Sequence, residues 1–130
     1  MNTKSVVTVS TAIEAATSLA LIGSPEWVAR VLLGAELAST GAAVARVAGF
    51  GLLSLAIACW PGNNNPTPRV VRALLVYNLL AGIYLGFLRV GGGFVSFLLW
   101  PASVLHIVLA VMLARPAFET STSAAANQDS

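Results

Sequence analysis

Charge is scarce in this chain of 130 residues, in which Lys and Arg together number 7, Asp and Glu number 5, and 9% of all residues are charged. Soluble domains carry about 25% charged residues. The hydrophobic fraction reaches 57%, and the mean hydropathy is +0.83. The length predicts one domain, because it is too short for separate membrane and soluble modules. The scarcity of charge and the high hydrophobic fraction predict an integral membrane protein.

Cysteine and histidine are limited to one residue each, Cys59 and His106. A single cysteine excludes an internal disulfide, a CxxC redox pair and a multi-cysteine metal site. One histidine with one carboxylate at its level falls short of the three or four ligands of a usual metal site. We therefore expect no metal and no cofactor. The basic residues are spread along the chain and form no stripe, so nucleic acid is not an expected partner.

Long apolar runs take the place of charge. Four segments are long enough, at about 1.5 Å per residue, to cross a hydrocarbon layer about 30 Å thick. The sequence predicts spans at about residues 5–22, 39–60, 69–90 and 94–114. The fold class is therefore all-α, a polytopic membrane protein with a four-transmembrane-helix bundle. It forms a single domain over residues 1–115, followed by a disordered polar tail over residues 116–130.

The connections between the spans carry their own signals. Residues 24–34 begin with Ser24-Pro25-Glu26, which is typical of a helix start, and place Trp27 beside other apolar residues. They predict a short interfacial helix between the first and second spans. Gly91-Gly92-Gly93 predicts a tight turn, so that the third and fourth helices form an antiparallel hairpin. Pro101 is predicted to kink the fourth helix.

Small residues recur every four positions in the second and third spans, and such repeats permit close helix contact. They are Gly41, Ala45 and Gly49 in the second span, and Gly82 and Gly86 in the third.

The basic residues predict the orientation of the chain, because they accumulate in cytoplasmic loops. If the N-terminus is cytoplasmic, that side carries Lys4, Arg69, Arg72 and Arg115. The opposite side carries Arg30 and Arg89. We expect a multi-pass protein of the bacterial inner (plasma) membrane with both termini in the cytoplasm.

Glu14 lies near the middle of the first span, where a carboxylate costs about 2.5 to 3.5 kcal/mol on insertion scales. Asn78 and His106 lie near the middles of the third and fourth spans. At about 1.5 Å per residue, all three lie roughly 12 to 14 Å from the cytoplasmic end. Tyr77 adjoins Asn78. The sequence thus predicts one polar layer, in which Glu14 and His106 interact directly, through a water or through Asn78.

Two interpretations of this layer stay open. In the structural one, Glu14, Asn78 and His106 satisfy one another and fix the register of the helices. In the functional one, a carboxylate and an imidazole bind or move a proton, or hold a polar ligand.

Arg46 lies some seven residues inside the second span. It is either an interface anchor, paired with Glu36 or Glu26, or a cation facing the bundle opposite Trp100 and Tyr84. The second arrangement would suit an anionic or quinone-like head group. Trp100 therefore joins Arg46 among the candidate site residues.

Several short motifs carry a resemblance to a family. They are Ala45-Arg46-Val47-Ala48-Gly49, Ala58-Cys59-Trp60-Pro61, Tyr77-Asn78, Leu99-Trp100-Pro101, His106 and the Glu14-Ala15 pair. Over about residues 10–115 the chain resembles small bacterial four-helix membrane proteins of unknown function, and more distantly the DoxX-like proteins. The resemblance implies the fold and a membrane location. Some DoxX-like proteins are implied to be subunits of quinone-linked oxidoreductases, but no motif here carries that activity.

The sequence supports two functional hypotheses. In the first, the chain is a small inner-membrane accessory or assembly subunit without independent catalysis, because no catalytic motif is present. Its partners are then the lipid bilayer and a homo-oligomer or larger membrane complex. In the alternative, the layer of Glu14, Asn78 and His106 forms a membrane-embedded binding or catalytic site for a small apolar or quinone-like ligand.

Overall fold

The computed structural model describes residues 1–62, 64–94 and 96–126. This part of the chain is helical and contains no strand. Its five helices are α1 (Thr3–Gly23), α2 (Pro25–Leu33), α3 (Ser39–Ala58), α4 (Pro68–Val90) and α5 (Leu99–Ala126). In the described residues, α1, α3, α4 and the Leu99–Phe118 part of α5 are long and apolar enough to cross a membrane. The predicted fold class, four long helices with a short one between the first two, is confirmed.

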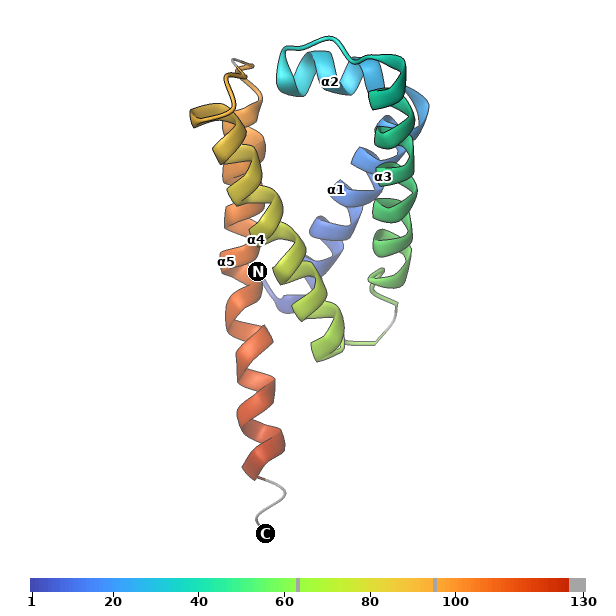
Figure 1. Ribbon diagram of the computed structural model, residues 1–130. Coiled ribbons are helices and arrows are strands. Elements are labelled where there is room, and N and C mark those ends of the chain that lie inside the picture. Colours follow the sequence, from blue (N-terminus) through green and yellow to red (C-terminus); the bar gives the residue numbers. More distant parts are fainter. Residues whose placement is uncertain (63, 95, 127–130) are drawn as a thin grey trace.

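The long helices pack as two antiparallel pairs, α1 with α3 and α4 with α5 (Figure 1). The predicted hairpin of the third and fourth spans is confirmed as the pair α4–α5. The pairs meet less extensively than the helices within each pair, and α1 makes most of the contacts between them, with α5 and α4. Side chains on α1 therefore have most opportunity to link the two halves.

The short helix α2 lies across one end of the bundle, next to the turn between α4 and α5 (Figure 1). It starts at Pro25 and ends at Leu33, and the next residue, Gly34, has a positive φ of 69° that suits a residue without a side chain. The Ser96 hydroxyl donates a hydrogen bond of 2.6 Å to the Val31 carbonyl oxygen. This contact connects α2, which belongs to the first half of the chain, to the turn that precedes α5.

The start of α5 differs from the prediction. The fourth span was expected at residue 94, but α5 begins at Leu99, because Ser96 bonds to α2 and its carbonyl oxygen accepts from Leu99 N. The predicted kink at Pro101 is wrong. Pro101 lies in the first turn of α5, where backbone N–H groups have no partner within the helix, so its missing N–H breaks nothing.

The far end of α5 also differs from the expected tail over residues 116–130. The helix continues through Pro116 to Ala126, and residues 127–130 lie outside the described part of the chain. The three consecutive alanines that end it favour helix strongly.

Two glycines allow the paired helices to approach closely. A Cβ at Gly82 of α4 would lie 2.7 Å from Ile107 Cδ1 and 3.1 Å from Ile107 N on α5. A Cβ at Gly49 of α3 would lie 3.1 Å from the Ser18 carbonyl oxygen on α1. Both glycines belong to the predicted small-residue repeats, which therefore mark helix contacts.

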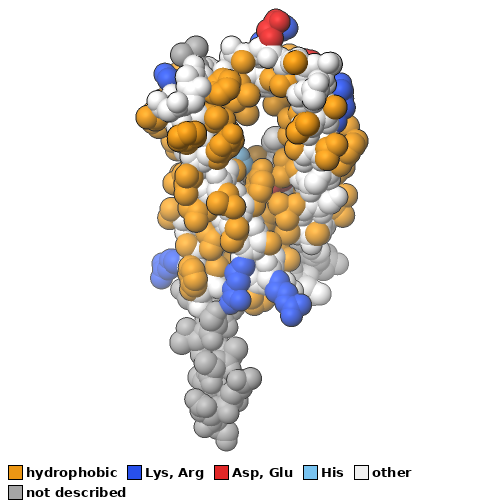
Figure 2. All heavy atoms as spheres, viewed as in Figure 1, with side chains coloured by type: hydrophobic (Ala, Val, Ile, Leu, Met, Phe, Trp, Pro, Cys, Tyr) orange, Lys and Arg blue, Asp and Glu red, His pale blue; other side chains and the backbone are white. Residues whose placement is uncertain are grey.

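The outside of the bundle is apolar between two charged ends (Figure 2). Large hydrophobic side chains such as Phe50, Ile83 and Val111 are more than half exposed. A soluble monomer rarely exposes so continuous an apolar surface, whereas hydrocarbon requires one. The chain therefore has the architecture of a multi-pass membrane protein.

Candidate functional site

Three helices bring polar side chains to one level inside the bundle. Ser10 and Glu14 come from α1, Asn78 from α4 and His106 from α5. Ser10 and Glu14 share a face of α1 because residues four apart are neighbours on a helix. Only 1% of Glu14 is exposed, and Ser10 and Asn78 are fully buried. His106 is half-buried, so it forms the accessible end of the group.

These four side chains form a continuous chain of hydrogen bonds. The Ser10 hydroxyl donates to Glu14 Oε1 at 3.0 Å, and Asn78 Nδ2 donates to the Ser10 hydroxyl at 2.9 Å. Asn78 Nδ2 also lies 3.4 Å from Glu14 Oε1. At the other end, Asn78 Oδ1 and His106 Nδ1 are 2.8 Å apart. The predicted interaction of Glu14 with His106 is confirmed, and it runs through Asn78.

The orientation of the Asn78 amide fixes the proton on His106. Asn78 Nδ2 lies 2.9 Å from the Leu74 carbonyl oxygen, which can only accept a hydrogen bond. The amide nitrogen must therefore face Leu74, and Oδ1 faces the imidazole. Because Oδ1 can only accept, His106 Nδ1 carries a proton. In the neutral imidazole, Nε2 is then an acceptor, and within the described residues it has no hydrogen-bond partner.

Glu14 has one oxygen that the chain of hydrogen bonds does not reach. Oε2 is buried and has no hydrogen-bond partner among the described residues. The partners of Oε1, the Ser10 hydroxyl and the Asn78 amide, are both neutral. A buried oxygen without a partner costs about 1 to 3 kcal/mol. The carboxyl group is thus the least satisfied member of the layer.

Tyr77 connects this layer to an open cavity. Its ring meets the His106 ring edge to face, with centroids 5.9 Å apart. The same ring lines a cavity of about 360 Å³ between α1, α3 and α4, whose other walls are Leu21, Ala48, Gly51, Leu52 and Leu55. Glu14, Asn78 and His106 do not line this cavity. Figure 2 also shows an opening between the two helix pairs below α2.

Arg46 lies outside the layer. Its Nε donates to the Ile22 carbonyl oxygen at 3.3 Å, and a terminal nitrogen lies 3.6 Å from Glu26 Oε1. Of the two arrangements that the sequence left open, the structure shows the pair with Glu26. Trp100 is 50% exposed in the first turn of α5. The structure therefore joins Glu14, Asn78, His106 and Tyr77, and leaves Arg46 and Trp100 apart from them.

The sequence did not identify Ser10 as a member of the site, although it lies one turn before Glu14. That spacing was the available signal, but Thr11 and Ser18 lie on the same face and bond to their own helix instead. Ser103, on the His106 face of α5, donates to the Gly82 carbonyl oxygen at 2.8 Å and does not join the layer.

Among the described residues, no group of three or more His, Cys, Asp or Glu side chains is placed to hold a metal ion.

Comparison of the chain with protein-family models, with curated proteins and with solved structures finds no match. The resemblance to small four-helix membrane proteins and to the DoxX-like group therefore stays a prediction from the sequence motifs.

Proposed function

We propose that this chain is an accessory or assembly subunit of a larger complex in the bacterial inner membrane, without independent catalysis and with both termini cytoplasmic. The observation that carries the proposal is the hydrogen-bonded layer. Asn78 bonds to Ser10 of α1 and to His106 of α5, and so joins the two helix pairs. The hydrogen bonds that join Glu14 Oε1, Ser10, Asn78 and His106 Nδ1 stabilise a helix arrangement and require no ligand.

A partner helix has a suitable place to pack. The cavity beside Tyr77 is open, and Ala48 and Gly51 of α3 form part of its wall. A Cβ built on Gly51 meets nothing within 4 Å. Small residues allow helices to approach closely within a membrane. A transmembrane helix of another subunit, or of a second copy of this chain, therefore fits this face.

The test is purification of the tagged protein from its native membrane in a mild detergent. We expect a defined partner to co-purify, and Gly51→Leu to remove it without lowering the unfolding temperature of the isolated protein. Ala73→Leu adds the same side chain at an exposed position of α4 and serves as the control. Repeated recovery of the wild-type chain alone, as a monomer or homodimer, would contradict the accessory role.

A second candidate function is a membrane-embedded site for a small apolar or quinone-like ligand. The specific observation in its favour is the half-buried His106, whose Nε2 has no hydrogen-bond partner among the described residues and whose ring contacts the Tyr77 ring that lines the cavity. The apolar part of a ligand would lie against Leu52 and Leu55, and the Tyr77 ring, which contacts His106, connects this cavity to the layer. The unpartnered Glu14 Oε2 adds a further buried polar atom.

A mutant cycle separates the two functions. Under the structural role, Glu14→Gln and His106→Ala each lower the unfolding temperature, and the double variant loses less than the sum of the two. Under the ligand role, the variants keep their stability but lose a cellular phenotype. They also lose a compound that solvent extraction and mass spectrometry detect in the wild-type preparation.

A further inference from the structure

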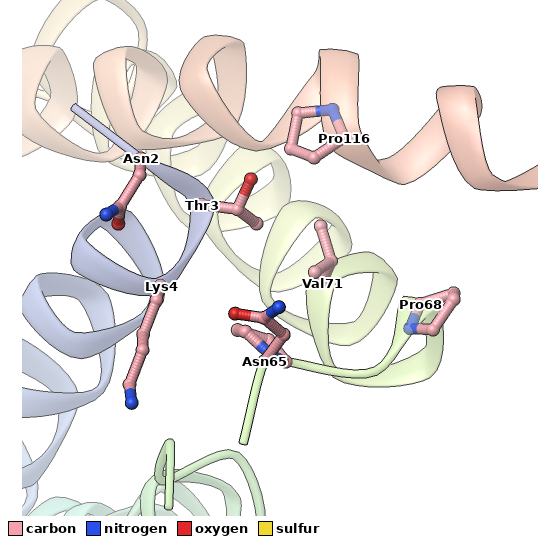
Figure 3. Close-up of a pocket in the computed structure, with 8 residues that line it drawn as sticks. Asn2, Thr3, Lys4, Asn65, Pro68, Val71 and Pro116 are labelled. Carbon is pink, nitrogen blue, oxygen red and sulfur yellow. The ribbon is translucent and has the colours of Figure 1, made fainter. Parts of the chain in front are cut away.

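A pocket of about 380 Å³ opens at the end of the bundle opposite α2, where the spans end. Its walls come from the start of α1, the α3–α4 loop, the start of α4, and α5. The polar lining comprises Asn2, Thr3, Lys4 and Asn65, and the apolar lining includes Val71 and Pro116. Figure 3 shows Thr3 and Asn65 pointing into the space between the starts of α1 and α4, with Lys4 at its margin and its ammonium extending away from Thr3.

Positive charge gathers at this end of the molecule. Basic side chains form a group there, below the apolar band (Figure 2). The sequence places Lys4 in the first turn of α1, Arg69 and Arg72 in the first turns of α4, and Arg115 next to the lining residue Pro116. Basic residues outnumber acidic residues in the segments at this end, where the acidic residue nearest to Arg115 in the sequence is Glu119. The starts of two helices add partial positive charge.

The lining matches the chemistry of a phosphate ester. The Lys4 ammonium supplies charge, and the Thr3 hydroxyl and the Asn65 amide supply neutral hydrogen-bond donors. Val71 and Pro116 give the pocket an apolar side that suits a glycerol backbone and the first carbons of an acyl chain. Basic pockets between transmembrane helices at the cytoplasmic surface are a recognised setting for lipid headgroups.

We propose that this pocket binds the phosphate group of an anionic phospholipid, of the phosphatidylglycerol type, from the leaflet at this end of the bundle. The phosphate lies among Lys4, Thr3 and Asn65, and the glycerol contacts Val71 and Pro116. The site is separate from the polar layer and does not depend on the accessory role.

The test uses the full-length chain in a neutral detergent and follows its unfolding temperature as lipid is added. Phosphatidylglycerol should raise this temperature more than phosphatidylcholine does, and inorganic phosphate should not reproduce the effect. Lys4→Gln should weaken the apparent affinity for phosphatidylglycerol about fivefold, since one basic residue contributes about 1 kcal/mol at a membrane surface. Asn65→Ala, which leaves the charge unchanged, should weaken it as well.

Two controls remove the same charge elsewhere. Arg30→Gln acts at the α2 end and Arg69→Gln at the same end but outside the lining, and both should keep most of the lipid effect. An equal loss in Lys4→Gln and Arg69→Gln would show diffuse attraction and overturn the pocket. An equal effect of phosphatidylcholine, or full stabilisation by inorganic phosphate, would overturn the lipid assignment. Because Asn65 lies in a loop, Asn65→Ala keeps the test valid if Lys4→Gln fails to fold.

Discussion

Asn78 uses both ends of its amide inside the bundle. Nδ2 donates to the Leu74 carbonyl oxygen and to the Ser10 hydroxyl, and Oδ1 faces His106. The hydrogen bonds that Leu74, Ser10 and His106 make with Asn78 therefore depend on the orientation of its amide as well as on its presence. An apolar residue of similar size fills the same space but satisfies none of these partners.

Asn78→Leu should lower the free energy of unfolding by about 1 to 3 kcal/mol, because it leaves His106 Nδ1 without its acceptor inside the bundle. Adding His106→Leu should cost less than the sum of the single changes, with a coupling of about 0.5 to 3 kcal/mol. Denaturant unfolding in detergent measures both quantities. Asn64→Leu in the exposed α3–α4 loop is the control and should stay within about 0.5 kcal/mol. Additive effects would show that the contact between Asn78 and His106 contributes nothing.

For Arg46 we expect substitution to cost little stability, in contrast to Asn78, although Arg46 also lies in an apolar span. The side chains of Arg46 and Glu26 are 43% and 49% exposed, and exposed ion pairs contribute about 0 to 1 kcal/mol. Arg46→Gln and Glu26→Gln should each cost less than about 1 kcal/mol in the same unfolding measurement. A loss above about 2 kcal/mol for Arg46→Gln alone would assign this guanidinium a role beyond the pair with Glu26.

At the scale of the helices, glycine position decides which surfaces can approach. Gly82→Ala places a methyl group against Ile107 of α5, and such overpacking costs about 1 to 3 kcal/mol. The higher helix propensity of alanine offsets up to about 1 kcal/mol of this cost. We therefore expect a net loss of stability, measured by thermal unfolding. Gly51→Ala, where a Cβ meets nothing, is the matched control and should be neutral or stabilising. Equal stability of the two variants would refute the close contact of α4 with α5.

The helices could be predicted from the sequence because a long apolar run in a chain with little charge has few other solutions. The common depth of Glu14, Asn78 and His106 followed from the rise per residue alone. The start of α5 could not be predicted, since it depends on the Ser96 contact with Val31 of a distant helix. For the same reason, the role of Ser10 and the choice of Glu26 as the partner of Arg46 needed the three-dimensional arrangement.

At the scale of the whole molecule, four spans in the described residues would place residues 1 and 126 on one side of the membrane. The basic excess at the end opposite α2 predicts that this side is cytoplasmic. Reporter fusions at Asn64 and Gly92 test the orientation. A reporter that is active only outside the cytoplasm should work at Gly92 and fail at Asn64. The reverse pattern would invert the topology.

The division into two helix pairs has a consequence for synthesis of the protein. The pair α1–α3 is complete before the ribosome has made Asn78, which Ser10 and Glu14 contact in the finished bundle. During that interval a newly inserted chain presents a carboxyl group inside the membrane without its amide partner. A fragment that stops after α3 would keep this defect permanently, so we expect the cell's membrane proteases to remove it rapidly while the complete chain persists.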